Sequence, residues 1–225
     1  MKKIFLSPFF TPIFFLIAWG LILATVLIFF PEQKFTITTD GEVIDIATYS
    51  GYALLIISFL FVYKDFNGRS AKTDWIILFL LSVCALLREA GIQHHLSSTD
   101  TTPFKSKFYF NPNNPLSEKI IFGLVLLIVF GMLIYIAIKY TKYLVTSFFK
   151  MNTVTWSTAV LCCLLVFAKI ADRFPANWRK AHDGVSMTRE QIDLCSLIEE
   201  SSEIFLPLTA VIILWQYHLI CKEKK

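Results

Sequence analysis

The stretch "IIFGLVLLIVFGMLIYIAI", residues 120–138, decides the fold class of this chain. It runs for nineteen residues without a single charged side chain. An α-helix rises about 1.5 Å per residue, so a run of this length crosses the roughly 30 Å hydrocarbon core of a bilayer. The stretch therefore predicts a transmembrane helix.

Five further apolar segments flank this one, and the composition agrees with them. The chain is 56% hydrophobic with a mean hydropathy of +0.61, whereas a soluble domain is about 45–50% apolar. We expect an all-α, multi-pass bundle of about six transmembrane helices, forming a single integral membrane domain over residues 1–225. The predicted spans cover about residues 12–30, 46–63, 75–92, 120–138, 153–170 and 204–221.

The distribution of charge sets the expected orientation. Six spans place both termini on one side of the membrane, where the segments outside the spans are short and basic, as cytoplasmic segments are. Fourteen of the 17 acidic residues fall on the other side. The N-terminal apolar run is too long for a signal peptide and is expected to be an uncleaved first span. We therefore expect both termini in the cytoplasm, a bacterial inner membrane as the location, and a functional site that faces the periplasm.

Composition also argues against several functions. The formal net charge of +4 is small and divided among loops, so it gives no support to nucleic-acid binding. The five cysteines form no C-x-x-C pair and are expected to be packing residues. The sequence contains neither the G-x-S-x-G nor the H-E-x-x-H signature of hydrolases, and we find no motif of a known family.

The stretch "LREAGIQHH", residues 87–95, places several polar and ionisable groups at the end of the third span. They are Arg88, Glu89, Gln93, His94 and His95. On a continuous helix, Arg88 and His95 share one stripe while Glu89 and Gln93 share the neighbouring one. Charges at membrane depth usually mark function, which favours a polar site open to the outer leaflet. The alternative is a helix end that emerges into water, with Arg88 extending to the interface.

Two more clusters are expected at the same membrane level. At the end of the fifth span, Lys169, Asp172 and Arg173 share a helix face. Before the sixth span, "TREQIDLCSLIEESSE" (188–203) predicts a helix that carries Asp193, Ser196, Glu199, Glu200 and Glu203. Acidic side chains are favoured at a helix N-terminus, which accounts for Glu199 and Glu200 better than for Glu203. If the three clusters meet, a purely structural ion-pair network is an alternative to a functional site.

Metal binding is a further hypothesis for the same side of the membrane. The weak candidate ligands are His94, His95 and His182, and together with the carboxylates they would suit zinc. Adjacent histidines on a helix point about 100° apart and rarely share an ion, however. The sequence therefore leaves the cofactor unknown, with zinc as the metal to test.

The leading functional hypothesis is an enzyme or binder that acts on a lipid or lipid-linked headgroup at the outer face. The residues expected to bind the substrate are Arg88, Glu89, Gln93, Lys169, Arg173 and Glu199. The residues expected to supply acid, base or metal-ligand chemistry are His94, His95, Glu200, Glu203 and Asp172. Membrane lipids are the expected partners, and the sequence leaves protein partners unknown.

Two other functions use the same groups. A transporter or proton-coupled carrier predicts polar residues that continue into the cytoplasmic half of the spans, where the sequence shows few. A non-catalytic membrane scaffold predicts that the charges pair only for structure, so that neutralising Glu200 or Arg88 lowers folded yield without affecting any activity.

Three local features give sharper expectations. Thr188 and Gln191 have the spacing of a capping box. Ser117 is a candidate N-cap for the fourth span. The segment "FKSKFYF", residues 104–110, alternates aromatic and basic side chains, which is typical either of a lipid-facing interfacial segment or of a β-like one. His218 is expected to be an interfacial residue.

Overall fold

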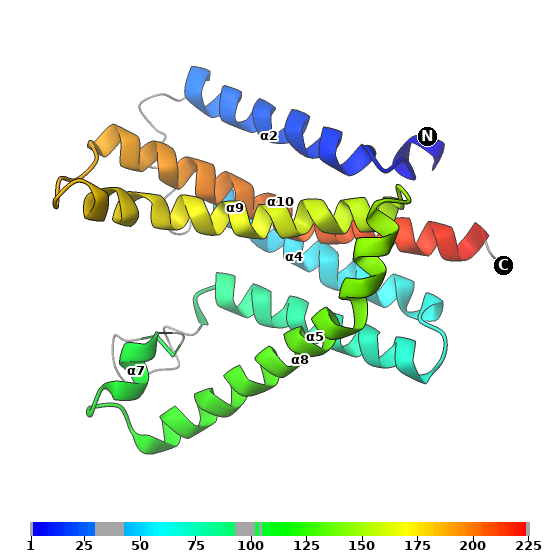
Figure 1. The fold of residues 1–225 in the computed structure, drawn as a ribbon, viewed down its shortest axis with the longest axis horizontal. Helices are drawn as coiled ribbons and strands as arrows, with labels where there is room; N and C mark the ends of the chain where they lie inside the picture. The colour runs from blue at the N-terminus through cyan, green and yellow to red at the C-terminus, as the bar shows by residue number, and fades with distance from the viewer. Residues whose placement is uncertain (1, 30–42, 93–101, 104, 224–225) are drawn as a thin grey trace. The chain divides into compact units, whose positions relative to one another are not determined.

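The structure, a computed structural model, describes residues 2–29, 43–92, 102–103 and 105–223. Within this part of the chain the regular structure is entirely helical (Figure 1). The elements are α1 (Lys2–Phe5), α2 (Phe10–Phe29), α4 (Val43–Val62), η1 (Tyr63–Asp65), α5 (Arg69–Glu89), α7 (Ser106–Phe110), α8 (Leu116–Phe148), α9 (Thr153–Ala181) and α10 (Arg189–Glu223).

Six of these helices are long and apolar enough to cross a membrane, which confirms the predicted spans. They are α2, α4, α5, α8, α9 and α10. Three of them are longer than the sequence indicates, with 33, 29 and 35 residues in α8, α9 and α10. At about 1.5 Å per residue these helices exceed a 30 Å core by roughly 15–20 Å. Parts of them therefore tilt or project beyond the hydrocarbon region.

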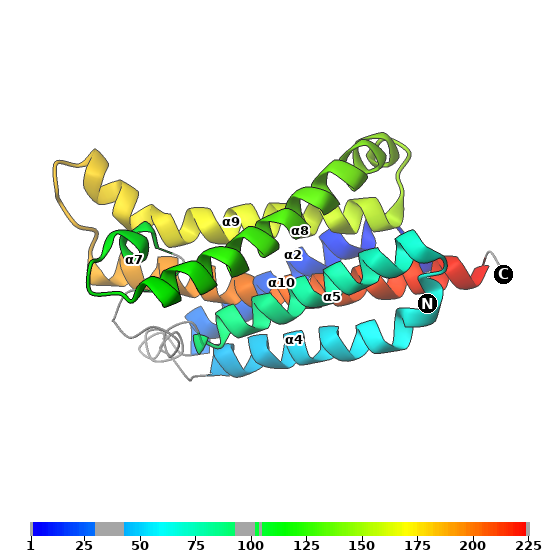
Figure 2. The same cartoon turned by 90° about the horizontal axis from the view of Figure 1, so that it is seen from below.

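The described residues group into two compact units. Unit 1 comprises residues up to Asp65 together with Ser147–Lys225, and unit 2 comprises Phe66–Thr146. In unit 1, α10 packs against α9, α4 and α2 (Figures 1 and 2). Its contact with α4 is close because Gly51 faces Pro207, where an added Cβ would lie only 2.8 Å from the proline Cγ.

Both ends of the chain lie at the same end of unit 1 (Figures 1 and 2). Lys2 Nζ lies 2.9 Å from Glu223 Oε1, and this ion pair joins α1 to the last turn of α10. An even number of spans requires the two termini to share one side of the membrane, and the contact satisfies that requirement. We call this end of unit 1 the terminal end, and the other end, where α9 and α10 are joined, the distal end.

Unit 2 is a helical hairpin with a short helix at one end. The segment after residue 104 folds back on the start of α8, where the buried Phe108 ring lies 5.6 Å from Phe122. Asn114 Nδ2 donates to the Phe108 carbonyl at 2.7 Å and closes the turn. The β-like alternative for this segment is therefore wrong, because Ser106–Phe110 is helical.

Of the two predicted capping signals, one is confirmed and one is wrong. Thr188 N donates to Gln191 Oε1 at 3.0 Å and Gln191 N donates to Thr188 Oγ1 at 3.4 Å, so the capping box is present. Ser117 is not the N-cap of α8, since this helix already begins at Leu116. The stripes predicted for the third span require a continuous helix, whereas α5 ends at Glu89 and Gly91 adopts a φ of 64°; Gln93 and His95 themselves lie outside the described residues. A glycine in this left-handed conformation is typical of a helix end.

Candidate functional site

The predicted site residues fall into three groups in the structure. Gln93, His94 and His95 lie outside the described residues. Arg88 and Glu89 belong to unit 2, whereas the clusters of α9 and α10 belong to unit 1. Their convergence into one site therefore stays a prediction.

The α9 cluster is an exposed arrangement around one carboxylate. Lys169 Nζ contacts Asp172 Oδ2, and Arg173 Nε lies 3.8 Å from the same oxygen. The Lys169 and Arg173 side chains are 64% and 67% exposed, while that of Asp172 is 36% exposed. Two cations thus share one anion on an open surface, which leaves a net positive charge available to a ligand. Surface ion pairs of this kind contribute little to stability.

The α10 cluster lies at the same level as the α9 cluster. Asp172 is nine residues from the end of α9, and Ile198 is nine residues from the start of α10, which packs against α9. In an antiparallel hairpin these two positions are level. Glu199, Glu200 and Glu203 are partly buried on the same stretch of α10. Within unit 1, the prediction of a common membrane level for these two clusters agrees with the helix bounds.

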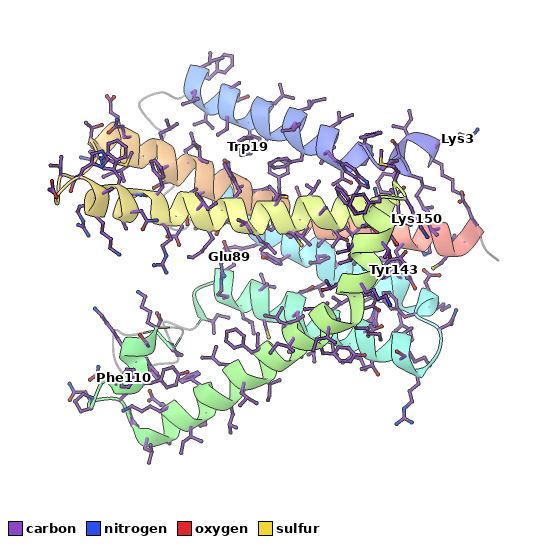
Figure 3. The ribbon with its side chains drawn as sticks, in the orientation of Figure 1. Lys3, Trp19, Glu89, Phe110, Tyr143 and Lys150 are labelled. Carbon is purple, nitrogen blue, oxygen red and sulfur yellow. The ribbon has the colours of Figure 1, made fainter. Side chains whose placement is uncertain are left out.

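Two buried serines adjoin the glutamates of α10. Ser201 and Ser202 are fully buried, and both donate to the Ile198 carbonyl. Trp19 Nε1 donates to Ser201 Oγ at 3.0 Å, so the indole of α2 (Figure 3) reaches the buried face of α10. The serine hydroxyls are engaged in helix packing, and their geometry shows no activation of a nucleophile.

In unit 2, the start of the "LREAGIQHH" stretch forms a loose pair. Arg88 Nη2 lies 3.8 Å from Glu89 Oε2, and the two side chains are 60% and 16% exposed. Neighbouring helical residues point in different directions, so this contact is a weak one. The exposed Arg88 side chain agrees with the alternative in which the helix end emerges into water.

The metal hypothesis finds no preformed site in the residues that the structure describes. Among them, no group of three or more His, Cys, Asp or Glu side chains is arranged to hold an ion. His182 stacks on Trp178 at 3.9 Å between ring centroids, and its Nδ1 lies 3.0 Å from the Trp178 carbonyl oxygen. His182 is therefore placed as a capping residue at the end of α9.

Sequence reasoning missed a buried polar triad at the terminal end. Thr11, Ser157 and Gln216 come from α2, α9 and α10 and are at most 1% exposed. Ser157 Oγ donates to Gln216 Oε1 at 2.6 Å, Gln216 Nε2 lies 3.4 Å from Thr11 Oγ1, and the two hydroxyls are 2.6 Å apart. Gln216 also donates to the Phe5 carbonyl at 3.1 Å. Although the sequence shows few polar residues in these parts of the spans, three of them are therefore buried together at the terminal end.

A buried acid–histidine pair lies at the same end. His218 Nδ1 bonds to Asp65 Oδ2, and the two side chains are 15% and 5% exposed. Trp215 contacts the imidazole edge-on, with ring centroids 5.5 Å apart, and is itself held by a bond from its Nε1 to Ser58 Oγ at 3.2 Å. His218 is therefore not simply an interfacial residue, because its ring is oriented by a carboxylate.

Unit 2 contains a second buried carboxylate. Lys139 Nζ donates to both oxygens of Asp74, at 2.6 and 2.7 Å. The hydroxyls of Tyr135 and Tyr140 donate to the same carboxylate at 3.1 and 2.5 Å. Three donor groups make four hydrogen bonds to this carboxylate, so the cluster pins α5 to α8 and leaves no lone pair for a ligand.

One perturbed group lies outside the spans. Burial raises the pKa of Tyr109 above its usual value. Its hydroxyl is buried and has no hydrogen-bond partner within the described part of the chain. The aromatic residues of α7 are thus partly packing groups of unit 2 rather than a free lipid-facing surface.

Comparison of the chain with protein-family models, with curated proteins and with solved structures finds no match. Functional inference for this chain therefore depends on its own residues.

Proposed function

We propose that this multi-pass membrane protein binds an anionic lipid or lipid-linked headgroup at the distal end of unit 1. Enzymatic action on that headgroup is a separate part of the proposal and has its own test. The observation that carries the proposal is the α9 cluster, in which Lys169 and Arg173 are about two-thirds exposed around the single Asp172 carboxylate. Guanidinium and ammonium groups are the usual ligands of phosphate and carboxylate headgroups. Glu199, on α10 of the same unit, would complete the binding surface.

The depth of the cluster suits a headgroup. Residues 169–173 lie about 25–30 Å along α9 from Thr153, close to the thickness of a hydrocarbon core. The last eight residues of α9 then project into water. A ligand anchored in the bilayer would present its headgroup at this level. Glu200, Glu203, Asp172 and one of His94 or His95 are proposed to supply acid or base chemistry there.

Binding is tested with pyrophosphate and glycerol phosphate, which carry the headgroup chemistry without acyl chains. The purified full chain is titrated in detergent by calorimetry. We expect Lys169→Gln/Arg173→Gln to weaken binding about tenfold or more at low salt. Arg179→Gln/Lys180→Gln removes the same charge from the exposed end of α9 and serves as the matched control. Equal loss in both variants, or no binding by the wild type, would contradict the proposal.

Catalysis is tested separately from binding. If the site is an enzyme, Glu200→Gln and Glu203→Gln abolish turnover of a lipid-linked substrate while pyrophosphate binding persists. If the glutamates only hold helices together, as in the scaffold alternative, the same variants lower folded yield and leave binding unchanged in the protein that does fold.

A proton-coupled carrier is the second candidate, and the buried Asp65–His218 pair favours it. Polar side chains occupy both ends of unit 1, as a carrier requires, and the pair is a proton-binding group at the terminal end. Its test is solute flux into proteoliposomes under an imposed pH gradient, with glycerol phosphate as the probe. His218→Gln should abolish gradient-driven flux while keeping downhill exchange. Flux that ignores the gradient would exclude this candidate.

The orientation and location belong to the same proposal. We place both termini in the cytoplasm of a bacterial cell, with the distal end at the periplasmic face of the inner membrane. Support comes from the basic residues of the terminal end and from the Lys2–Glu223 contact that brings the two termini together. A green fluorescent protein fused after Lys225 should fluoresce, whereas alkaline phosphatase at the same point should be inactive. The reverse result would invert the orientation.

A further inference from the structure

Two segments far apart in the sequence form one surface at the terminal end of unit 1. Thr153 Oγ1 donates to the Leu6 carbonyl at 2.5 Å, so the start of α9 is tied to the segment after α1. The rings of Phe9 and Trp156 lie 5.7 Å apart and extend this contact. Lys3 and Lys150 each lie three residues before one partner of the hydrogen bond, at this same end (Figure 3).

The surface combines cations with exposed apolar side chains. Phe149, Ile4 and Phe9 are 81%, 66% and 47% exposed. Lys3 and Lys150 are also exposed. We call these five residues the terminal patch. Water is a poor solvent for an apolar tip as large as Phe149, whereas the boundary between headgroups and acyl chains accommodates aromatic rings beside lysine.

The turn that presents the patch is held in a defined shape. Asn152 N donates to the Ser147 carbonyl at 3.2 Å and Met151 N donates to the Phe148 carbonyl at 3.1 Å. This pair of bonds is a Schellman motif, with Met151 in the left-handed conformation at φ 56°. Phe149 and Lys150 therefore project from a fixed turn.

Acidic groups of unit 1 at this end are already engaged. Glu223 pairs with Lys2, and Asp65 bonds to His218. Within the described part of unit 1, no ion pair is formed by Lys3 or by Lys150. The patch thus carries two positive charges that an anionic ligand can neutralise.

We propose that the terminal patch is a binding site for an anionic phospholipid of the leaflet on the side of the termini. The lysine ammonium groups of Lys3 and Lys150 contact the headgroup phosphate, while Phe149, Ile4 and Phe9 lie among the first acyl carbons. A free phosphate would use the two cations but not the apolar side chains, so the ligand is a lipid. This site is distinct from the proposed headgroup site at the distal end and does not depend on it.

The test is native mass spectrometry of the purified full chain in detergent, with equal amounts of phosphatidylglycerol and phosphatidylcholine added. We expect the wild type to retain phosphatidylglycerol preferentially. Each lysine near a membrane surface contributes about 1 kcal/mol, so Lys3→Gln/Lys150→Gln should weaken that binding about 30-fold at low salt. Lys3→Arg/Lys150→Arg should restore most of it, and Phe149→Ser should weaken the binding of both lipids.

Two results would overturn the proposal. One is equal retention of the two lipids by the wild type. The other is an equal loss of phosphatidylglycerol in Arg179→Gln/Lys180→Gln, which lowers the net charge as much but leaves the patch intact. Failure of the proposed headgroup site at the distal end would be detected by a different experiment, the pyrophosphate titration. In that titration the terminal-patch variants should bind pyrophosphate as the wild type does.

Discussion

The two ends of unit 1 handle polar groups in opposite ways. At the terminal end, Thr11, Ser157 and Gln216 are buried and bonded to one another across three helices. At the distal end, Lys169 and Asp172 are exposed, and their contact stays within one helix. Bonds across helices fix the helices relative to one another, whereas bonds within one exposed turn do not. The buried triad at the terminal end therefore serves packing between helices, whereas the α9 cluster at the distal end is a surface arrangement within one helix.

The difference follows from what each environment demands. A buried amide without partners costs several kcal/mol in an apolar surrounding, so Gln216 is stable only because its oxygen and nitrogen are both bonded. Lys169 and Arg173 are about two-thirds exposed and need no buried partner. Charge in an apolar sequence thus does not by itself identify the polar groups that hold the fold together.

The largest expected effect comes from breaking the terminal triad. Gln216→Ala removes an acceptor for Ser157 and a donor to the Phe5 carbonyl, and it leaves a cavity. We expect the free energy of unfolding in detergent to fall by about 3 kcal/mol. The measurement is denaturant-induced unfolding followed by tryptophan fluorescence. Asn177→Ala on the exposed face of α9 is the control and should change stability by less than about 0.5 kcal/mol. Equal effects would mean that the triad does not stabilise the bundle.

Asp74→Ala should come next, in unit 2. The substitution removes the one acceptor shared by Lys139, Tyr135 and Tyr140. We expect a loss of about 2 kcal/mol, because Lys139 can still reach solvent while the tyrosine hydroxyls lose a charged partner. Thermal unfolding of the purified chain measures it. Asp45→Ala, in the first turn of α4, is the control because it removes a partly exposed carboxylate. An equal loss of stability in this variant would mean that the bonds to Asp74 contribute nothing beyond those of an ordinary carboxylate.

These cases show what could be predicted from the sequence. Long apolar runs determine the six spans, since length and hydropathy alone decide whether a helix can cross a bilayer. The capping box of Thr188 and Gln191 was predictable because its two bonds join residues three apart. The triad was not, because Thr11, Ser157 and Gln216 are single polar residues in apolar runs and are brought together only by packing.

The site was predictable to a lesser degree, again for a physical reason. Lys169, Asp172 and Arg173 do share a face, because all three lie on one uninterrupted helix. The stripe proposed for Arg88 and His95 requires a continuous helix, whereas α5 ends at Glu89 and Gly91 adopts φ 64°; His95 lies outside the described residues. A glycine followed by polar residues is a known stop signal, so the sequence did contain the information. The link from Asp65 to His218 joins residues 153 positions apart and had no local signal.

A smaller change of opposite sign is expected at the turn between α8 and α9. Met151 adopts φ 56°, which is unfavourable for a residue with a side chain. Met151→Gly should raise the free energy of unfolding by about 1 kcal/mol, since glycine is the preferred residue at this position of a Schellman motif. Unfolding by denaturant measures the gain. Gly184, at φ 89°, offers the reverse control, because Gly184→Ala should be destabilising by a similar amount. A loss in Met151→Gly would show that the methionine side chain stabilises the turn through contacts.

The smallest effect on stability should come from Asp172→Asn at the distal end. The carboxylate is a surface partner, so we expect a change below about 0.5 kcal/mol in the free energy of unfolding.

The affinity of the Asp172→Asn variant for pyrophosphate should change in a different way. With Asp172 present, the cluster of two cations and one anion has a net charge of +1, and asparagine raises it to +2. One additional unit charge near an anion in water contributes about 1 kcal/mol, so pyrophosphate should bind about fivefold more tightly at low salt. If Asp172→Asn left the affinity for pyrophosphate unchanged and lowered the free energy of unfolding, Asp172 would be a packing residue. Its role would then resemble that of the buried triad at the terminal end.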